Sequence, residues 1–146
     1  MAESLNEVEQ LCWRTFIESS WALHTHLEDE LRAQTGLSTN DYHVMVTLSE
    51  APDHRLRMGE LASRLVFSPS RITYQISSMV KRGLVRKQPC PEDGRGQEAV
   101  LTDEGMAALE AAAPLHLVTV RDSFIDRLDE EELAVITRVF EKVRKA

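Results

Sequence analysis

The sequence predicts a mainly α-helical chain that carries one small β-hairpin. Apolar residues recur every three or four positions along most of the chain, which is the spacing of helices with one buried face. The exception is residues 85–101, where two short apolar segments flank a loop rich in proline, glycine and charged residues. That pattern is typical of two strands joined by a turn.

Capping boxes predict the starts of the first two helices. Ser4-x-x-Glu7 predicts a helix that runs to about residue 33, and Ser38-x-x-Asp41 predicts a second that ends near residue 49. In this motif the two side chains satisfy backbone N–H groups that a helix start otherwise leaves without a partner.

Two short helices are predicted to meet at Ser68-Pro69. Ser is a good N-cap, and Pro is tolerated at the first helical position because its missing N–H would have no partner there. The buried face of the helix before this pair is predicted from Leu61, Ala62 and Leu65. The buried face of the helix after it is predicted from Ile72, Ile76, Met79 and Val80, and Gly83 ends the helix.

Strands around Val85 and residues 99–101 complete the hairpin. Thr102 begins a long helix that reaches about residue 128, and Asp129-x-x-Glu132 begins the last helix. Two helices followed by a hairpin form a winged helix-turn-helix, here at about residues 38–101. Terminal helices at about 4–33 and 102–146 flank it, and the length of 146 residues suits a single domain over 1–146.

The charge is distributed unevenly along the chain. The net charge is −7, yet the segment from Arg64 to Arg95 holds seven basic and two acidic residues, a net +5 on a remainder of −12. A basic segment on an acidic body predicts a protein that meets phosphate with one face only. The alternative is a charged surface that is merely solvated.

Several classes of protein are not expected from the sequence. We expect neither a signal peptide nor a membrane span, so the cytoplasm is the predicted location. Two distant cysteines, Cys12 and Cys90, do not make a disulfide framework. The sequence contains no phosphate-binding loop, zinc-protease motif or nucleophile elbow. We therefore expect no enzyme, no cofactor and no metal site.

The run GELASRL…SPSRIT…MVKRGLVRKQPCPEDGRG…LTDEG resembles the MarR family of bacterial transcription regulators. The resemblance extends upstream through GLSTNDYHVMVTLSEAP and covers nearly the whole chain. It implies a homodimer that binds a palindromic double-stranded operator, most often as a repressor that a small ligand releases. The rival from another class is a winged-helix module that binds protein and not DNA, which needs no basic reading face.

The polar face of the second motif helix would enter the major groove. The expected base-reading residues are Ser68, Ser70, Arg71, Thr73 and Tyr74, and the expected phosphate contacts are Lys81, Arg86 and Lys87. Many family members have Arg in place of Tyr74 and a polar or basic residue in place of Pro69, so the recognised bases stay open. Packing of Tyr74 against its neighbours is the alternative.

In the hairpin loop, the resemblance implies that Arg95 enters the minor groove while Asp93 holds it. A narrow minor groove concentrates negative potential and attracts a guanidinium. The alternative is a surface ion pair of little energetic worth.

The terminal helices are predicted to form a dimer. A small winged domain has little free surface to cover the apolar stripe of the last helix. This stripe consists of Leu133, Ile136, Val139, Phe140 and Val143. The alternative is a bundle within one chain.

The resemblance also implies two sites on the helices. The first is a cleft for a small aromatic or phenolic ligand, with Trp21, His24, His43 and Met106 as the residues expected there; ordinary core is the alternative for each. The second, a rival to release by a ligand, is a redox-sensing thiol at Cys12, because some family members sense peroxide through a cysteine early in the first helix and QLCW here superficially resembles their local sequence. A small hydrophobic role for Cys12 is the alternative.

Overall fold

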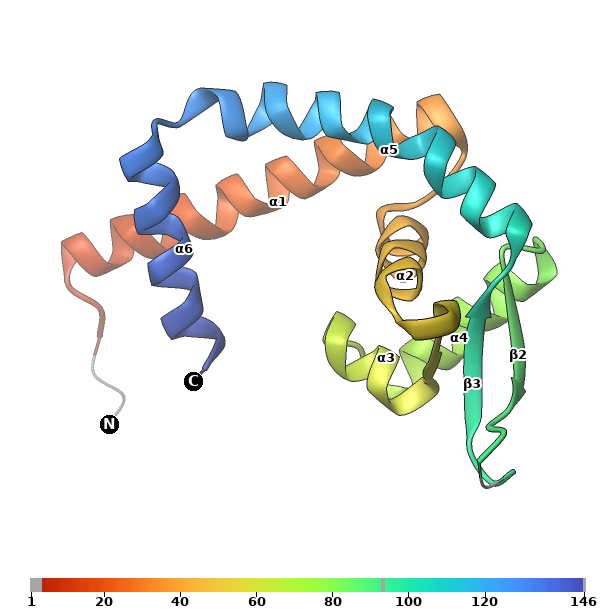
Figure 1. Ribbon diagram of the computed structural model, residues 1–146. Helices are drawn as coiled ribbons and strands as arrows, with labels where there is room; N and C mark the ends of the chain where they lie inside the picture. The colour runs from red at the N-terminus through yellow and green to blue at the C-terminus, as the bar shows by residue number, and fades with distance from the viewer. Residues whose placement is uncertain (1–3, 93, 146) are drawn as a thin grey trace. The chain divides into compact units, whose positions relative to one another are not determined.

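The computed structural model describes residues 4–92 and 94–145 (Figure 1). The helices and strands follow one another as α1 (Glu7–Thr35), α2 (Thr39–Glu50), β1 (Arg55–Arg57), α3 (Met58–Leu65), α4 (Pro69–Lys81), β2 (Val85–Pro89), β3 (Gln97–Leu101), α5 (Asp103–Ser123) and α6 (Glu130–Arg144). Short 3-10 turns lie at Pro52–His54 and Ile125–Arg127. The predicted fold class, mainly helical with a small sheet, is confirmed. No helix in the described ranges is long and apolar enough to cross a bilayer.

The chain separates into two compact units. One comprises residues 31–115, and the other comprises residues up to 30 together with those from 116 onward. The first of these is longer at both ends than the winged part expected at about 38–101, because it includes the end of α1 and the first half of α5.

The unit of residues 31–115 contains a three-stranded antiparallel sheet in the order β1-β3-β2. In the register, Leu56 of β1 pairs with Ala99 of β3, and Lys87 of β2 pairs with the same residue from the other side. Strand β1 was not predicted, since three residues are too short to show alternation. It exists because β3 offers it a hydrogen-bonding edge.

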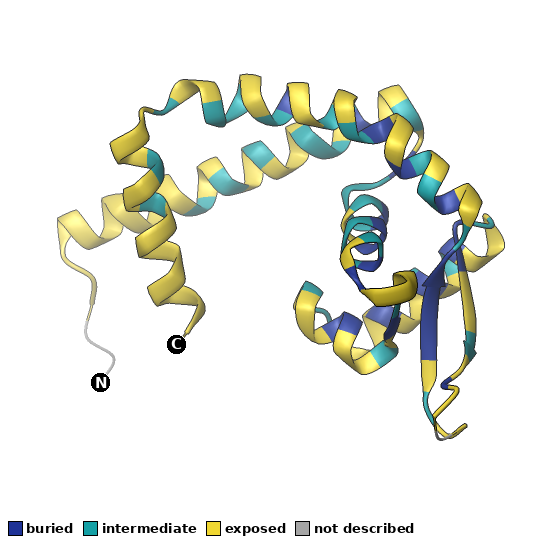
Figure 2. Cartoon of the chain, viewed as in Figure 1, coloured by how far each residue is buried: buried dark blue, intermediate teal, exposed yellow. Residues whose placement is uncertain are grey.

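The core of this unit lies among α2, α3, α4 and the sheet (Figure 2). Its fully buried side chains include Met45, Leu48, Leu61, Ile76 and Met79. The prediction that Val80 is buried was wrong, because its side chain is 41% exposed. The stripe of Ile72, Ile76 and Met79 is narrow, and Val80 follows Met79 by one residue and lies beside that stripe.

Most predicted caps are confirmed. Ser38 with Asp41 and Asp129 with Glu132 form complete capping boxes, and Thr102 Oγ1 accepts a hydrogen bond from the Gly105 amide at 3.0 Å. The first box was placed wrongly. Asn6 and not Ser4 caps α1, since Asn6 Oδ1 accepts from the Glu9 amide at 2.9 Å and the Glu9 carboxylate accepts from the Asn6 amide at 2.8 Å.

Helix α5 is shorter than predicted. It ends at Ser123 and not near residue 128, and a 3-10 turn over Ile125–Arg127 leads toward α6. No glycine or proline marks this end in the sequence. The turn is instead held by side chains, because Arg127 Nε donates to the Asp122 carbonyl at 2.9 Å and Arg121 pairs with Asp126.

The unit formed by both ends of the chain has very little core of its own. Among its described residues, α6 has none that is buried and the N-terminal part of α1 has none either. Figure 2 shows these segments almost entirely as exposed or half-buried. Phe16 and Phe140 contact each other, with ring centroids 5.2 Å apart, yet both stay about 40% exposed.

Candidate nucleic-acid interface

The turn between α3 and α4 sets where α4 begins. Val66 adopts a left-handed conformation with φ of 57°, and its amide closes α3 by donating to the carbonyl of Ser63. Ser68 then caps α4, its Oγ accepting from the Arg71 amide at 3.2 Å, and Pro69 occupies the first turn as predicted. The sequence therefore folds locally into the expected helix-turn-helix.

The polar face of α4 is open to solvent. Every described residue that the sequence analysis placed at the interface is exposed: Ser68, Ser70, Arg71, Thr73, Tyr74, Lys81, Arg86, Lys87 and Arg95. Tyr74 is 80% exposed, so its ring does not pack into the core. Thr73 Oγ1 donates to the Pro69 carbonyl at 2.9 Å. The helix thus presents hydroxyl, phenol and cationic groups on one side and buries the other.

Arg71 is held by an aromatic ring that the sequence did not indicate. Its guanidinium carbon lies 3.8 Å from the centre of the Phe67 ring. A guanidinium stacked on a ring loses fewer degrees of freedom on binding than a free one. Phe67 is half-buried against the core, so the ring is a fixed platform. An aromatic residue four positions before a helix arginine was the available signal.

The hairpin loop is built around Gly94 and Gly96. Gly94 has φ of 64°, a conformation that suits glycine, and its amide donates to the Cys90 carbonyl at 2.9 Å. A Cβ on Gly96 would lie 3.1 Å from the Cys90 sulfur and 2.8 Å from Arg57 Nη1. Cys90 is accordingly a buried structural residue. Arg95 is exposed at the tip, whereas the expected partner Asp93 lies outside the described residues.

Strand β2 carries two further exposed cations, Arg86 and Lys87. Arg86 Nε donates to Gln88 Oε1 at 3.3 Å. Gln88 in turn donates to the buried carboxylate of Glu98 on β3 at 2.7 Å, which also lies 3.7 Å from Arg55 on β1. This polar ladder joins all three strands and holds the hairpin to the rest of the sheet.

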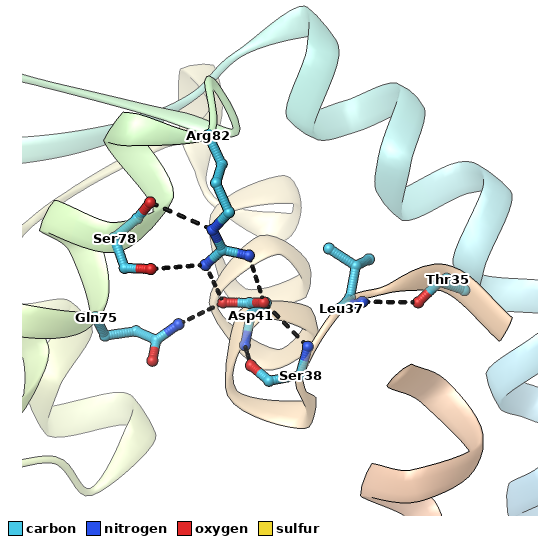
Figure 3. Close-up of polar contacts among 7 residues, drawn as sticks. All are labelled: Thr35, Leu37, Ser38, Asp41, Gln75, Ser78 and Arg82. Carbon is cyan, nitrogen blue, oxygen red and sulfur yellow. Dashed lines mark hydrogen bonds and ion pairs between the residues drawn. The ribbon is translucent and has the colours of Figure 1, made fainter. Parts of the chain in front are cut away.

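A buried carboxylate ties α4 to the start of α2 (Figure 3). Asp41 Oδ1 accepts hydrogen bonds from Gln75 Nε2 and Arg82 Nη2, and Oδ2 accepts one from Arg82 Nη1, each at 2.7 Å. Burial by itself raises the pKa of Asp41, but hydrogen bonds from Arg82 and Ser38 and the charge of Arg82 outweigh it and hold that pKa below its ordinary value of 3.8. Sequence reasoning counted Arg82 with the basic segment, yet its charge is neutralised here.

The residues expected at the ligand cleft do not meet within one unit. Trp21 and His24 belong to the unit of the chain ends and are exposed, whereas His43 and Met106 belong to the unit of residues 31–115. Met106 packs against the core and His43 is exposed. A cavity of about 460 Å³ exists in the latter unit, lined by other residues: Gln34, Thr35, Gly36, Leu37, Arg82, Leu84, Ala108, Ala111, Ala112 and Leu115. Cys12 is an exposed thiol on α1.

Comparison with known proteins places this geometry in a family. Residues 35–96 match the sequence profile of the MarR family. AbsC, a MarR family transcriptional regulator from Streptomyces coelicolor, is 38% identical with a TM-score of 0.94, over 99% of this chain and 97% of AbsC. Sco3205, a regulator of the same family and organism solved in complex with DNA, is also 38% identical, with a TM-score of 0.95 over 99% and 91%.

A curated relative agrees with these two structures. The transcriptional repressor YetL of Bacillus subtilis is 32% identical over 107 residues, which are 73% of this chain and 64% of YetL, so the match spans less than two thirds of the length of YetL. All three relatives are transcriptional regulators, which agrees with the expectation that this chain is not an enzyme. The chain belongs to the MarR family of transcriptional regulators.

Proposed function

We propose that this regulator reads a palindromic double-stranded operator by inserting α4 of each of two chains into the major groove. The observation that carries the proposal is the division of α4 into a buried apolar stripe and an exposed face that bears Ser70, Arg71, Thr73 and Tyr74. A helix with this division, entered through a short turn from α3, has the geometry that major-groove readers use. Sco3205, at 38% identity, was solved in complex with DNA, which supports DNA binding by this chain.

Each exposed residue then has a role that follows from its chemistry. Arg71, Ser68 and Ser70 at the start of α4 and Thr73 and Tyr74 on the same face would meet base edges, where Arg makes a bidentate contact with guanine O6 and N7. Lys81, Arg86 and Lys87 would contact phosphates, which position the protein without specifying sequence. Arg95, with Asp93 beside it in the sequence, would enter the minor groove.

The unit of the chain ends supports a homodimer. Most exposed large hydrophobic side chains of the described residues lie in it: Leu5, Val8, Leu11, Trp13, Phe16, Trp21, Leu117, Val118, Val135, Val139, Phe140 and Val143. A bundle within one chain, the alternative, would bury the stripe of α6, but Val139, Phe140 and Val143 are each at least 40% exposed. An exposed apolar surface of this extent calls for a partner, and a second copy with two-fold symmetry matches a palindromic site.

We further propose that the dimer is a repressor released by a small aromatic or phenolic ligand. YetL, a relative at 32% identity, is a repressor. The cavity beside the end of α4 has the size of a small-molecule site and is lined largely by apolar side chains. A ligand can bind more tightly to a dimer in which the spacing of the two reading helices differs from the spacing that fits the operator. Such a ligand lowers operator affinity by an amount set by the difference between its affinities for the two states.

Selection of duplexes from a random pool by the purified protein tests the reading role. We expect enrichment of an inverted repeat whose half-sites lie about one helical turn apart. The logarithm of the affinity for that duplex should fall linearly with the logarithm of the salt concentration, with a slope of about −0.9 per phosphate neutralised. Enrichment of no sequence over random DNA at low salt would contradict the proposal.

Operator release by benzoate and phenol, used as probes, tests the ligand role. Ala111→Trp fills the cavity and should abolish release while leaving operator affinity in place, because Ala111 is not on the reading face. Trp21→Ala is the matched variant. Release that survives Ala111→Trp and disappears with Trp21→Ala would move the site to the residues first expected from the sequence.

A further inference from the structure

A single buried carboxylate makes the polar contacts between α2 and α4, beside the apolar core that the two helices share. Asp41 is 3% exposed, although it stands in the first turn of α2. It accepts four hydrogen bonds: one from Gln75 of α4 and two from Arg82, the C-cap residue of that helix, each at 2.7 Å, and one from the Ser38 amide at 3.0 Å. Both carboxylate oxygens are therefore saturated by partners on fixed elements, as Figure 3 shows.

The contacts on α4 lie at two points along one side of the helix. Gln75 and Arg82 are seven residues apart, roughly 10 Å along the helix axis, and Ser78 between them accepts from Arg82 through its hydroxyl at 3.1 Å and its carbonyl at 3.3 Å. Two directional contacts to the same carboxylate resist rotation of the helix about its own axis. The apolar stripe of α4 also opposes rotation, since turning the helix would expose Ile72, Ile76 and Met79, and the hydrogen bonds to Asp41 add a directional restraint to it.

Rotation of α4 matters because its reading face is narrow. Arg71 and Tyr74 face the solvent on the side of the helix not occupied by the core, and a turn of the helix would change which of them reaches a base edge. Base contacts depend on donor and acceptor geometry, whereas phosphate contacts depend mainly on charge. A restraint on rotation should therefore act on sequence discrimination more than on general DNA affinity.

We propose that Asp41 is a positioning residue for sequence reading, which fixes the rotation of α4 through Gln75 and Arg82 and keeps the Arg82 charge occupied. This proposal rests on the proposed reading role of α4. Asp41 itself does not contact DNA under the proposal, and it acts only through the two side chains that it binds. The ratio of operator affinity to random-duplex affinity is the quantity that it controls.

Asp41→Asn tests the proposal in the full-length protein, with affinities measured for the selected operator and for a random duplex. The substitution keeps the shape of the side chain and removes its charge. We expect operator affinity to fall about tenfold, the size of one lost charged hydrogen-bond contact, while random-duplex affinity stays equal or rises because Arg82 is released. The ratio should fall accordingly.

Ser38→Ala is the matched control. It removes the hydrogen bond from the Asp41 amide to Ser38 Oγ at 2.9 Å, and so weakens the same cap, but it leaves the contacts to α4 intact. It should lower thermal stability and leave the affinity ratio unchanged. If Asp41→Asn lowers both affinities together, or keeps the ratio of the unmodified protein, the positioning role is wrong.

Two further variants keep the test decisive. Gln75→Ala leaves the ion pair of Asp41 and Arg82 in place and should lower the affinity ratio by itself. This variant provides the test if Asp41→Asn does not fold. Asp41→Asn combined with Arg82→Gln should lower the affinity ratio no further than the more harmful single variant does, because the two residues act as one unit. If the two effects on the ratio were fully additive, the proposal would be overturned. Failure of the reading role is recognised separately, since the unmodified protein would then show no preference for any duplex.

Discussion

At the residue scale, Arg71 combines a fixed position with a side chain able to read a base. Its guanidinium lies on Phe67 while its amide closes the cap of Ser68. We expect Arg71→Ala to cost roughly 1–3 kcal/mol on the preferred operator and to relax preference at one base pair. Phe67→Leu keeps an apolar side chain and removes the stacking, so it should reduce affinity by less, about 0.5–1 kcal/mol. Affinities of both variants for operators with single-base changes provide the measurement. If Arg71→Ala weakened binding equally at every base pair, Arg71 would contact phosphate and not a base.

Arg95 should behave differently from Arg71, since it lies at the exposed tip of the hairpin. Arg95→Ala should weaken binding most on duplexes whose flanks are A·T-rich, because a narrow minor groove attracts the guanidinium. Lys87→Ala is the comparison, and it should weaken all duplexes alike and reduce the salt slope by about 0.9. Equal loss on A·T-rich and G·C-rich flanks for Arg95→Ala would remove its proposed role in the minor groove.

Asp41 makes stability depend on pH in a defined direction. Its pKa in the folded protein lies below the ordinary 3.8, so the folded state favours the ionised carboxylate. The contribution to stability is present above about pH 4 and is lost as pH falls through the lower folded pKa. Urea midpoints measured from neutral pH down to about pH 3 should therefore fall less steeply for Asp41→Asn than for the unmodified protein. Parallel curves would mean that Arg82 does not stabilise the ionised form.

At the scale of elements, the start of α5 packs directly against Leu84, the residue that precedes β2. A Cβ on Gly105 would lie 2.1 Å from the Leu84 carbonyl oxygen and 2.7 Å from Leu101 Cδ1, and Thr102 Oγ1 lies within hydrogen-bonding distance of the same carbonyl at 3.0 Å. Glycine is needed here for close approach and not for an unusual φ. The junction between sheet and helix thus depends on the missing side chain.

Gly105→Ala should therefore destabilise the protein by about 1–3 kcal/mol, the cost of overpacking a close backbone contact. Gly59→Ala is the matched control, because Gly59 is also helical and has nothing within 4 Å of a built Cβ. That control should be neutral or stabilising by up to about 1 kcal/mol. Chemical denaturation of both variants provides the measurement, and equal effects would show that α5 moves freely to admit a methyl group.

At the scale of the whole molecule, the two units differ in what they bury. Residues 31–115 have a continuous core, whereas the described residues of the chain ends leave their apolar stripes exposed. Val143→Glu places a charge on the stripe of α6 and should raise the dimer dissociation constant at least about tenfold, because an unpaired charge is costly to bury. Arg138→Glu, on the same helix, should change it little. Sedimentation equilibrium distinguishes them, and a monomeric unmodified protein at micromolar concentration would contradict the dimer.

Local chemistry was sufficient to predict most elements and the exposed face of α4. The caps at Ser38, Ser68, Thr102 and Asp129 depend on interactions within one turn, so the sequence alone located them. The exposed residues of α4 followed from helical periodicity for the same reason. Errors of position arose where two signals compete within a turn, as at the start of α1, where Asn6 with Glu9 prevailed over Ser4 with Glu7.

The sequence by itself thus determined the order of helices, the hairpin and the family of this protein. Tertiary structure decided what depends on residues far apart in the chain. Strand β1 needs the edge of β3, and the stacking platform of Arg71 needs a ring whose orientation is set by the core. The pairing of Asp41 with Arg82 spans 41 residues, and no local pattern distinguishes a cation that binds a buried carboxylate from one that meets phosphate. Only the packing of α2 against α4 brings those charges together.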